Sequence, residues 1–402
     1  TYVAAQRDAA STAERRSALD AALQTARGGD LPAALEALEA IPVPASPDVT
    51  QVTALQLGGQ LLQGLGQPRE AASRYQQATD AAMAIGWIAR AAFVQNQVGA
   101  SAWQGSAFAM ARDAFVRAYE LEKERGDRVR EATLLANIAA VDDAFGDSAS
   151  AVSRYETALA IQEELGDEVG IARTLGNLAA ALQRVGALEQ GLVHLERSLA
   201  LREKHCDKLG IAAALSGLGG HYLKLSRLTK ALDHFQRALV LLESIGNAHG
   251  VAVVKSQLGS VHTQLGSYVR ARTYFEDARA GRLAVGDVAG AGGNLADLAQ
   301  LASRLGDNER ARELFQQSIE VAKKVGDRRG VVNGTANLAL VLYLLGDSET
   351  AEAMYKQSAE DLERLGDLRG VASARANLCL LYTSDAADEH RDVGVGGGGG
   401  GG

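Results

Sequence analysis

Small residues recur in this chain at a fixed spacing of 40 positions, and few folds tolerate such regularity. Beginning at Gly126-Asp127, a small residue followed by a polar one returns without insertion at Gly166-Asp167, Cys206-Asp207, Gly246-Asn247, Gly286-Asp287, Gly326-Asp327 and Gly366-Asp367. One step earlier lies Gly86-Trp87. A second series lies 20 positions out of phase, at Gly66, Gly146, Gly186, Gly266, Gly306 and Gly346, with Ser106 and Ser226 in its two gaps.

An interval of 20 residues holds one helix, so the repeated unit is a pair of helices that occurs about eight times. A single pair cannot bury its apolar face alone, and a stack of pairs can. The spacing therefore predicts a solenoid, which offers a long concave surface and no single catalytic cleft.

The copy that starts at Asp167 shows how the pairs are expected to form. Gly166 can take the left-handed conformation that ends one helix, and Asp167 can cap the next one. Apolar residues with helical spacing then predict a first helix, helix A, over about 169–185. After Gly186, a second helix, helix B, is predicted over about 188–204.

Composition agrees with an all-helical chain of 402 residues, because 47% are apolar, 5% are aromatic and only five are proline. The net charge of −8 and the absence of any Lys or Arg run argue against nucleic acid or an anionic membrane as partner. No stretch reaches the roughly 20 apolar residues of a membrane-spanning helix. Two distant cysteines, Cys206 and Cys379, make no disulfide framework, so we expect a cytoplasmic protein.

Three further positions repeat a pattern of small, large and small side chains. Helix A carries a small residue at Gly59, Gly99, Ala139, Ala179, Gly219, Gly259, Ala299 and Ala339. Sixteen residues later helix B carries a bulky one, at Tyr75, Phe115, Tyr155, Leu195, Phe235, Phe275, Phe315 and Tyr355. A small residue follows three positions on, as at Ala78 and Ser198. Small residues let helices approach closely, and the large ring fills the remaining space.

This pattern resembles the tetratricopeptide repeat, in its 40-residue variety, as found in kinesin light chains and bacterial regulators. The resemblance covers about residues 48–380 and implies an all-α, right-handed superhelical solenoid of antiparallel helix pairs. It departs from the family at the proline that closes a 34-residue copy; a longer helix B and the Gly-Asp turn stand there instead.

We expect four segments along the chain. Residues 1–47 form a degenerate helical segment, 48–366 hold eight tandem repeats, and 367–378 begin a truncated ninth. Residues 379–402 resemble a translated sequencing adapter followed by a run of glycines, and we interpret them as a non-native tail of a reading frame cut at both ends. The alternative is a natural linker with a glycine tail.

No motif in the chain predicts catalysis, a metal site or a cofactor. The string Gly290-Ala291-Gly292-Gly293 follows a helix, whereas a phosphate-binding glycine loop follows a strand. His221 and His262 lie on neighbouring A helices without a third ligand in metal-binding spacing. We therefore expect a protein that is not an enzyme. Asp142-Asp143 is expected to form a solvated acidic face, or else to favour basic ligands in the groove.

The best functional candidates form a polar ladder on the A helices. With a spacing of 40 residues it comprises Gln97, Asn137, Asn177, Gly217, Gln257, Asp297, Asn337 and Asn377. A carboxamide offers donors and an acceptor and can hold the backbone of an extended peptide. The family uses asparagines at this position in that way, which the resemblance carries to Asn137, Asn177 and Asn337. Arg173 and Asn333, one turn earlier, would extend the same wall, and Gly217 interrupts it.

The sequence thus predicts a non-catalytic scaffold that binds a peptide or an extended segment of another protein in its concave groove. In one alternative reading of the ladder, its side chains bond to the adjacent helix or to water. One alternative function is the sensory portion of a larger bacterial signalling protein, such as a transcription regulator, ATPase, cyclase or protease. The other is an assembly surface for self-association.

Overall fold

The structure is a computed structural model that describes residues 2–364, 370–371 and 374–379, with side chains from residue 11 onward. Throughout these residues the regular secondary structure is helical and contains no strand, which confirms the all-α prediction. The chain divides into two compact units, residues 1–205 and 206–402, here named unit 1 and unit 2.

Unit 1 consists of consecutive helices joined by short turns. They are α1 (Tyr2–Arg27), α2 (Leu31–Glu39), α3 (Val49–Gly64), α4 (Pro68–Ala84), α5 (Ile88–Gln104), α6 (Phe108–Arg125), α7 (Arg128–Ala144), α8 (Ser148–Leu165), α9 (Glu168–Val185) and α10 (Leu188–Lys204). The bounds of α9 and α10 agree with the predicted helices A and B of this copy to within one residue.

Unit 2 continues the pattern. Its helices are α11 (Lys208–Lys224), α12 (Leu228–Ser244), α13 (Ala248–Gln264), α14 (Tyr268–Ala284), α15 (Val288–Arg304), α16 (Asn308–Val325), α17 (Arg328–Leu344) and α18 (Ser348–Arg364). Residues 370–371 and 374–379 are helical as well. The interpretation of 379–402 as a non-native tail falls, apart from Cys379, outside the described residues.

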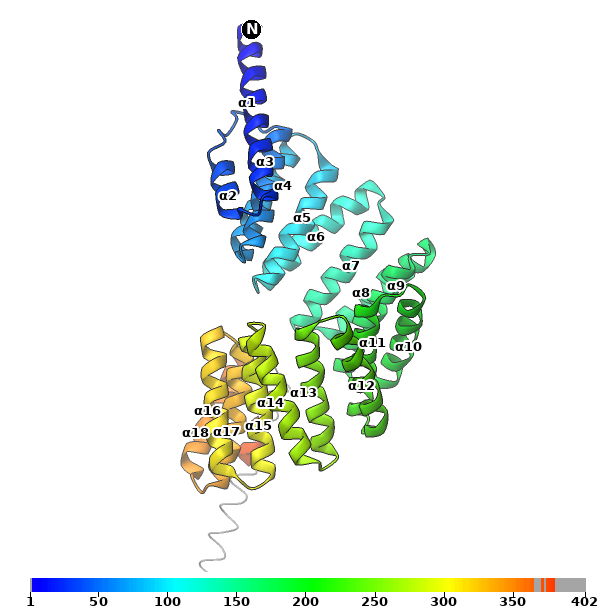
Figure 1. Ribbon diagram of the computed structural model, residues 1–402, viewed down its shortest axis with the longest axis vertical. Coiled ribbons are helices and arrows are strands. Elements are labelled where there is room, and N and C mark those ends of the chain that lie inside the picture. The colour runs from blue at the N-terminus through cyan, green and yellow to red at the C-terminus, as the bar shows by residue number, and fades with distance from the viewer. Residues whose placement is uncertain (1, 365–369, 372–373, 380–402) are drawn as a thin grey trace, which may run out of the picture. The chain divides into compact units, whose positions relative to one another are not determined.

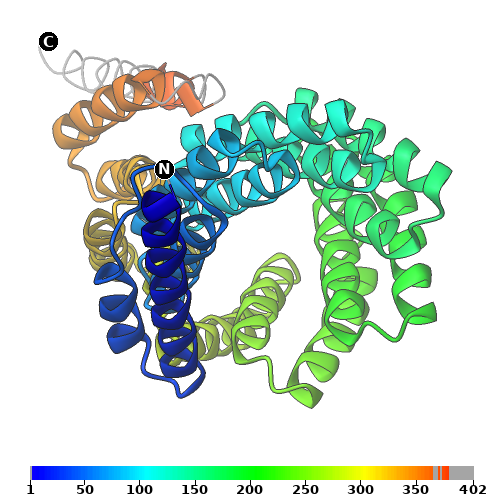
Figure 2. The ribbon, with the colours of Figure 1, turned by 90° about the horizontal axis from the view of Figure 1, so that it is seen from above.

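Within each unit every helix packs against the next one in the chain, as the pairs in Figures 1 and 2 show. The odd-numbered helices, which are the A helices of the repeats, also contact one another: α7 meets α9 in unit 1, and in unit 2 the contacts run from α11 to α13, α15 and α17. Each stack is therefore closest along its odd-numbered helices, and side chains on their exposed faces are brought near those of the next repeat.

The turns between helices follow the predicted chemistry. Gly166 ends α8 with a left-handed φ of 67°, and the Asp167 side chain accepts a hydrogen bond of 2.9 Å from the backbone N–H of Gly170. Where the series lacks glycine, Ser106, Cys206 and Ser226 take the same conformation, with φ between 54° and 58°. A residue with a Cβ is strained there, so the turn geometry is imposed by the packed helices on either side.

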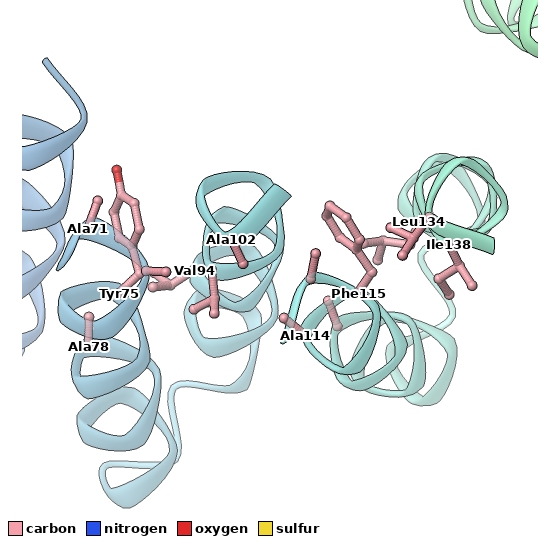
Figure 3. Close-up of a cluster of buried hydrophobic side chains, with 14 of the residues drawn as sticks. Ala71, Tyr75, Ala78, Val94, Ala102, Ala114, Phe115, Leu134 and Ile138 are labelled. Atoms are coloured by element: carbon pink, nitrogen blue, oxygen red, sulfur yellow. The ribbon is translucent and has the colours of Figure 1, made fainter. Parts of the chain in front are cut away.

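The core is built from the small and large positions read in the sequence. A Cβ added to Gly99 of α5 would clash with the ring of Phe115 of α6, since it would lie 2.5 Å from Cδ1. The same ring packs with Leu134 and Ile138 of α7, so it joins its own pair to the next one (Figure 3). In unit 2 the ring of Phe235 lies over Gly219 in the same way.

Residues before the first full copy also form a helical pair. The pair consists of α1 and α2, and Asp30 caps α2 by accepting a hydrogen bond from the backbone N–H of Ala33. Both helices contact α3. The buried Arg15 of α1 donates a hydrogen bond of 2.6 Å to Asp48, the cap of α3, which ties this pair to the array.

Candidate functional site

Several positions of the polar ladder lie where neighbouring odd-numbered helices meet. In unit 1 the Asn137 side chain on α7 donates a hydrogen bond of 3.2 Å to Asn96 on α5. In unit 2 the Ser256 hydroxyl on α13 donates to Asp297 on α15 at 3.3 Å. Asn294 donates to both groups, at 2.8 Å to Ser256 and 3.1 Å to Asp297. These ladder residues join adjacent helices, as the alternative reading expected.

Asp297 carries the one carboxylate of the ladder. Burial raises the pKa of Asp297 above its ordinary value, while the hydrogen bonds from Asn294 and Ser256 act in the opposite direction. No lysine or arginine among the described residues forms an ion pair with it. The hydrogen bonds to the carboxylate come from neutral donors, while the charge of Arg282 also lowers the pKa of Asp297.

Other predicted site residues have no hydrogen-bond or ionic partner within the described part of the chain. Arg173 and Asn177 are exposed on α9, one turn apart, and Asn333 is exposed on α17. Asn337 of α17 is half-buried. Gln257 of α13 keeps its side-chain oxygen buried without a partner among the described residues. All five side chains have hydrogen-bonding capacity left for a ligand.

A groove of about 480 Å³ in unit 2 brings some of these side chains together. It is formed by α15, α16, α17, the end of α18 and the helical residues that follow. The carboxamides in its wall are Gln300, Asn333, Asn337 and Asn377. Its other lining residues are Ala289, Gly292, Gly293, Ala296, Ser318, Ala322, Val325, Asp327, Gly330, Gly334, Ala336, Leu362, Gly370 and Ala374.

The groove does not include every predicted residue. Asn137, Asn177 and Arg173 belong to unit 1, while Gln257 and Asp297 lie in unit 2 away from the groove lining. Asp327, the only charged residue in the described lining, already accepts a hydrogen bond of 2.9 Å from the backbone N–H of Gly330. Apart from this carboxylate, the described lining consists of amides and of small or apolar side chains.

The three glycines of the string 290–293 on α15 have different roles. The backbone N–H of Gly290 donates to Asp287 at 2.8 Å and belongs to the helix cap. Gly292 packs so closely on Val321 that an added Cβ would lie 2.7 Å from its Cγ1. Gly293 faces the groove and has no atom within 4 Å of such a Cβ. Sequence reasoning overlooked Gly293 and Gln300, since the spacing alone does not tell a packed glycine from an open one.

The expectation for Asp142-Asp143 is wrong in both forms. Both carboxylates are buried, because arginines on three helices surround them. Asp142 accepts hydrogen bonds from Arg112 at 2.8 Å and from Arg154 at 2.6 Å, and Asp143 pairs with Arg184 and with the Ser148 hydroxyl at 2.7 Å. The hydrogen bond to Asp142 raises the pKa of Arg112. These acids hold repeats together.

Two histidines of unit 2 pack against tyrosines of the paired helix. The imidazole of His234 stacks on Tyr222 and that of His262 on Tyr274, with ring centres 5.3 Å apart in both pairs. Burial lowers the pKa of His262. Within the described ranges, no three His, Cys, Asp or Glu side chains form a group that could hold a metal ion. The described helices also include none that is long and apolar enough to cross a membrane.

Comparison with known proteins agrees with the geometry. The family model described as tetratricopeptide repeat matches residues 170–244, 210–284 and 293–364. A search of curated proteins found no match. Repeats of this family imply a protein-interaction scaffold.

Solved structures share the fold at low sequence identity. A Rap protein complexed with competence and sporulation factor is 16% identical, with 84% of this chain and 99% of that chain covered and a TM-score of 0.56. Aspartyl phosphate phosphatase F from Bacillus subtilis is 13% identical, with 88% and 94% covered and a TM-score of 0.57.

A signal transduction ATPase with numerous domains from Pyrococcus horikoshii, which has a tetratricopeptide repeat sensor, is 16% identical. The alignment covers 91% of this chain and 54% of that protein, with a TM-score of 0.53. At these identities the likeness shows the fold alone. Helix pairs, turns, packing positions and family match together show that this chain is a tetratricopeptide repeat protein.

Proposed function

We propose that the chain binds an extended segment of another protein along its odd-numbered helices, and that the groove of unit 2 holds part of that segment. The observation that carries the proposal is the meeting of Asn333, Asn337 and Asn377 in one groove. Asn333 and Asn337 have no partner among the described residues, so their donors and acceptors are available to a ligand.

The chemistry of the groove favours a peptide backbone as the group that is recognised. Each carboxamide can donate to a backbone carbonyl and accept from a backbone N–H. A typical hydrogen bond contributes about 0.5–1.5 kcal/mol net, so binding needs several of them in register. Successive ladder positions on α5, α7 and α9 and on α13, α15 and α17 supply such a series, which Gly217 interrupts on α11. The other members of the proposed site are Asn137, Asn177, Arg173, Gln257 and Asp297.

A related fold supports the same function by analogy. The Rap protein complexed with competence and sporulation factor covers most of this chain with a tetratricopeptide repeat fold. Fold likeness does not transfer a ligand. It does support the view that an array of this fold can hold a binding partner.

The proposed function includes no catalysis and no cofactor. Asp327 is the one titratable residue in the described lining of the groove, and its carboxylate caps α17. We also propose a cytoplasmic location, with neither nucleic acid nor membrane as partner. The net charge of −8 disfavours both, and Cys206 and Cys379 are free and exposed, as suits a reducing compartment.

The test uses a random dodecapeptide library displayed on phage and selected on the full chain. Binding of an enriched peptide is then measured by fluorescence anisotropy. Replacing Asn333 and Asn337 together with Ala should raise its Kd about tenfold or more, which corresponds to about 1.4 kcal/mol. Gln316 and Gln317 provide the control, since both are exposed on α16 outside the groove lining. Their double Ala variant should bind as the parent does. Equal affinity of the Asn variant would contradict the proposal.

The second candidate is the sensory portion of a larger signalling protein. It is favoured by the Pyrococcus horikoshii ATPase, in which a tetratricopeptide repeat sensor matches 91% of this chain but the match spans only 54% of that protein. Sequencing the gene beyond both ends tests this role. An adjoining nucleotide-binding or DNA-binding domain would support it, and stop codons at both borders of the array would contradict it.

A further inference from the structure

Gly293 lies in the middle of α15 without a packing reason to be glycine. Its side-chain position is exposed, its φ is not in the left-handed region, and a Cβ built on it meets nothing within 4 Å. Its neighbour Gly292 and the nearby Gly334 differ, because an added Cβ would lie 2.7 Å from Val321 and from Ile319 respectively. Glycine in a helix interior is destabilising relative to alanine, so at position 293 the fold gains nothing in return.

The same position on other odd-numbered helices carries a side chain. Multiples of 40 residues away stand Phe93, Thr133, Arg173, Ala213, Val253 and Asn333. Position 293 therefore lacks the side chain that these equivalent positions carry, and we call this missing side chain the gap. Since it lines the groove, the gap adds room where Asn333 and Asn337 would hold a backbone on α17, the next odd-numbered helix in contact with α15.

The chemistry around this gap favours an uncharged occupant. Next to Gly293 on α15, Ala289 and Ala296 present only methyl groups to the groove, and Gln300 presents an amide. The carboxylate of Asp327 is the single charge of the described lining and already accepts a hydrogen bond from Gly330. An anionic group placed there would lose water without gaining a cation, and a cationic group would have this one carboxylate alone as its partner.

We propose that the bound segment seats one bulky, uncharged side chain, such as Phe, Tyr, Trp, Leu or Met, against Gly293. The inference rests on the proposed function and adds a specificity pocket to it. The groove volume of about 480 Å³ leaves space for such a side chain beside the backbone. The amides of α17 would fix the backbone, and the gap on α15 would select the residue.

The experiment uses peptides from the same random dodecapeptide library. Peptides whose affinity depends on Asn333 and Asn337 should share one large uncharged residue. The Gly293→Leu variant should weaken them at least tenfold, because the new side chain fills the pocket, and Gly293→Ala should weaken them less. Ala280→Leu is the matched control, since Ala280 is exposed on α14 outside the groove lining, and it should leave the affinity unchanged.

A double-mutant cycle tests whether the pocket contacts the large uncharged residue that the peptides share, here named the anchor residue. Replacing the shared large residue of the peptide with Ala should cost at least tenfold in affinity on the parent chain. On Gly293→Leu the same change should cost less than threefold, because the contact is already gone. Thermal melts should show that Gly293→Leu is at least as stable as the parent, so that lost binding reflects the filled pocket.

The outcomes separate this inference from the proposed function. Peptides that depend on the two asparagines but bind Gly293→Leu as tightly as the parent would overturn the pocket and leave backbone recognition standing. A charged residue as the shared anchor would also overturn it. If the affinity of every selected peptide is the same for the parent chain and for the variant in which Asn333 and Asn337 are Ala, the result would contradict both the proposed function and the pocket. A selection that yields no peptide bound in the groove would do the same.

Discussion

Unit 1 and unit 2 pack their helices with the same residue types, yet the exposed faces of their odd-numbered helices differ in chemistry. In unit 1 the guanidinium of Arg90 lies 5.3 Å from the ring centre of Trp87 and 5.6 Å from that of Phe93, and Arg130 lies 6.0 Å from Phe93. In unit 2 the positions equivalent to Arg90 and Arg130 are glycines, at Gly210, Gly250, Gly290 and Gly330, as is Gly170 at the end of the series in unit 1.

The contrast shows which positions the repeat constrains. Rings such as Phe115 and Phe235 are buried in both units, and the glycines beneath them could not carry a Cβ. An exposed position such as Gly293 makes no such contact, whereas a Cβ added to Gly250 would lie 2.7 Å from Leu242 and one added to Gly330 would clash with Asp327. Both units present amides on these helices, to which unit 1 adds cations and aromatic rings and unit 2 adds a gap. An array of repeated helix pairs can thus present two chemically different surfaces.

The largest expected effect concerns the shared packing. Phe115→Ala and Phe235→Ala should each lower the free energy of unfolding by about 3–5 kcal/mol, because both rings are buried and leave a cavity. Urea unfolding followed by circular dichroism measures the loss, and hydrogen exchange should locate it in α5–α7 and in α11–α13 respectively. Val240→Ala, at a side chain that is 67% exposed, should cost less than about 0.5 kcal/mol. A loss in only one unit would break the claim of equal packing.

A smaller effect is expected at the buried acid of unit 1. Asp142→Asn keeps the shape but removes the charge that accepts hydrogen bonds from Arg112 and Arg154. Both arginines are more than a third exposed, so water replaces part of the lost interaction. We expect a loss of about 1–3 kcal/mol in the free energy of unfolding, measured in urea. An unchanged midpoint would mean that the arginines do not hold α6, α7 and α8 together.

The acid of unit 2 should respond with the opposite sign. The pKa of Asp297 is raised in the folded state by burial, so its ionised form destabilises the fold at neutral pH. Asp297→Asn should therefore raise the melting temperature at pH 7. Lowering the pH toward the ordinary value of 3.8 protonates the parent residue, relieves its penalty and should shrink the difference between the two proteins.

Paired melting curves from pH 7 to pH 4 measure this effect. Asp113→Asn serves as control, because Asp113 is exposed on α6, and it should show no such trend. An advantage of Asp297→Asn that grows as the pH falls would show that the carboxylate is stabilised by its neighbours and that the comparison with Asp142 fails.

Residues of the array differ in how far the sequence predicts their roles. The turn at Gly166-Asp167 could be predicted because helix ends need particular backbone and cap chemistry within a few residues. The ring of Phe115 over Gly99 follows from the fixed offset within one copy. Both features are local or repeat with the register, so one copy predicts the others.

The pairing of Asp142 could not be predicted in that way. Its partners Arg112 and Arg154 are 30 and 12 residues distant, and arginine recurs at these two positions in some copies only, since the next copy has Val152 and His194 there. The spacing placed the ladder on one helix face, yet it did not tell Asn137, which bonds to Asn96, from Asn177, which has no partner in the described part of the chain. Those differences depend on single non-repeating residues across the contact between helices.

The smallest expected effect separates the two adjacent glycines of α15. Gly293→Ala should raise the free energy of unfolding by about 0.5–1 kcal/mol, because alanine restricts the unfolded chain and its methyl group meets open space. Gly292→Ala should not raise the free energy of unfolding in this way, since its Cβ would lie 2.7 Å from Val321 and force α16 to shift. Urea titrations of the two variants and the parent measure the difference. Equal stability of both variants would place Gly293 under the same packing constraint as Gly292, and the gap in the wall of unit 2 would then be a feature of packing. A gain at Gly293 alone would instead show that this chain keeps a less stable helix at its groove, a cost that ligand binding explains.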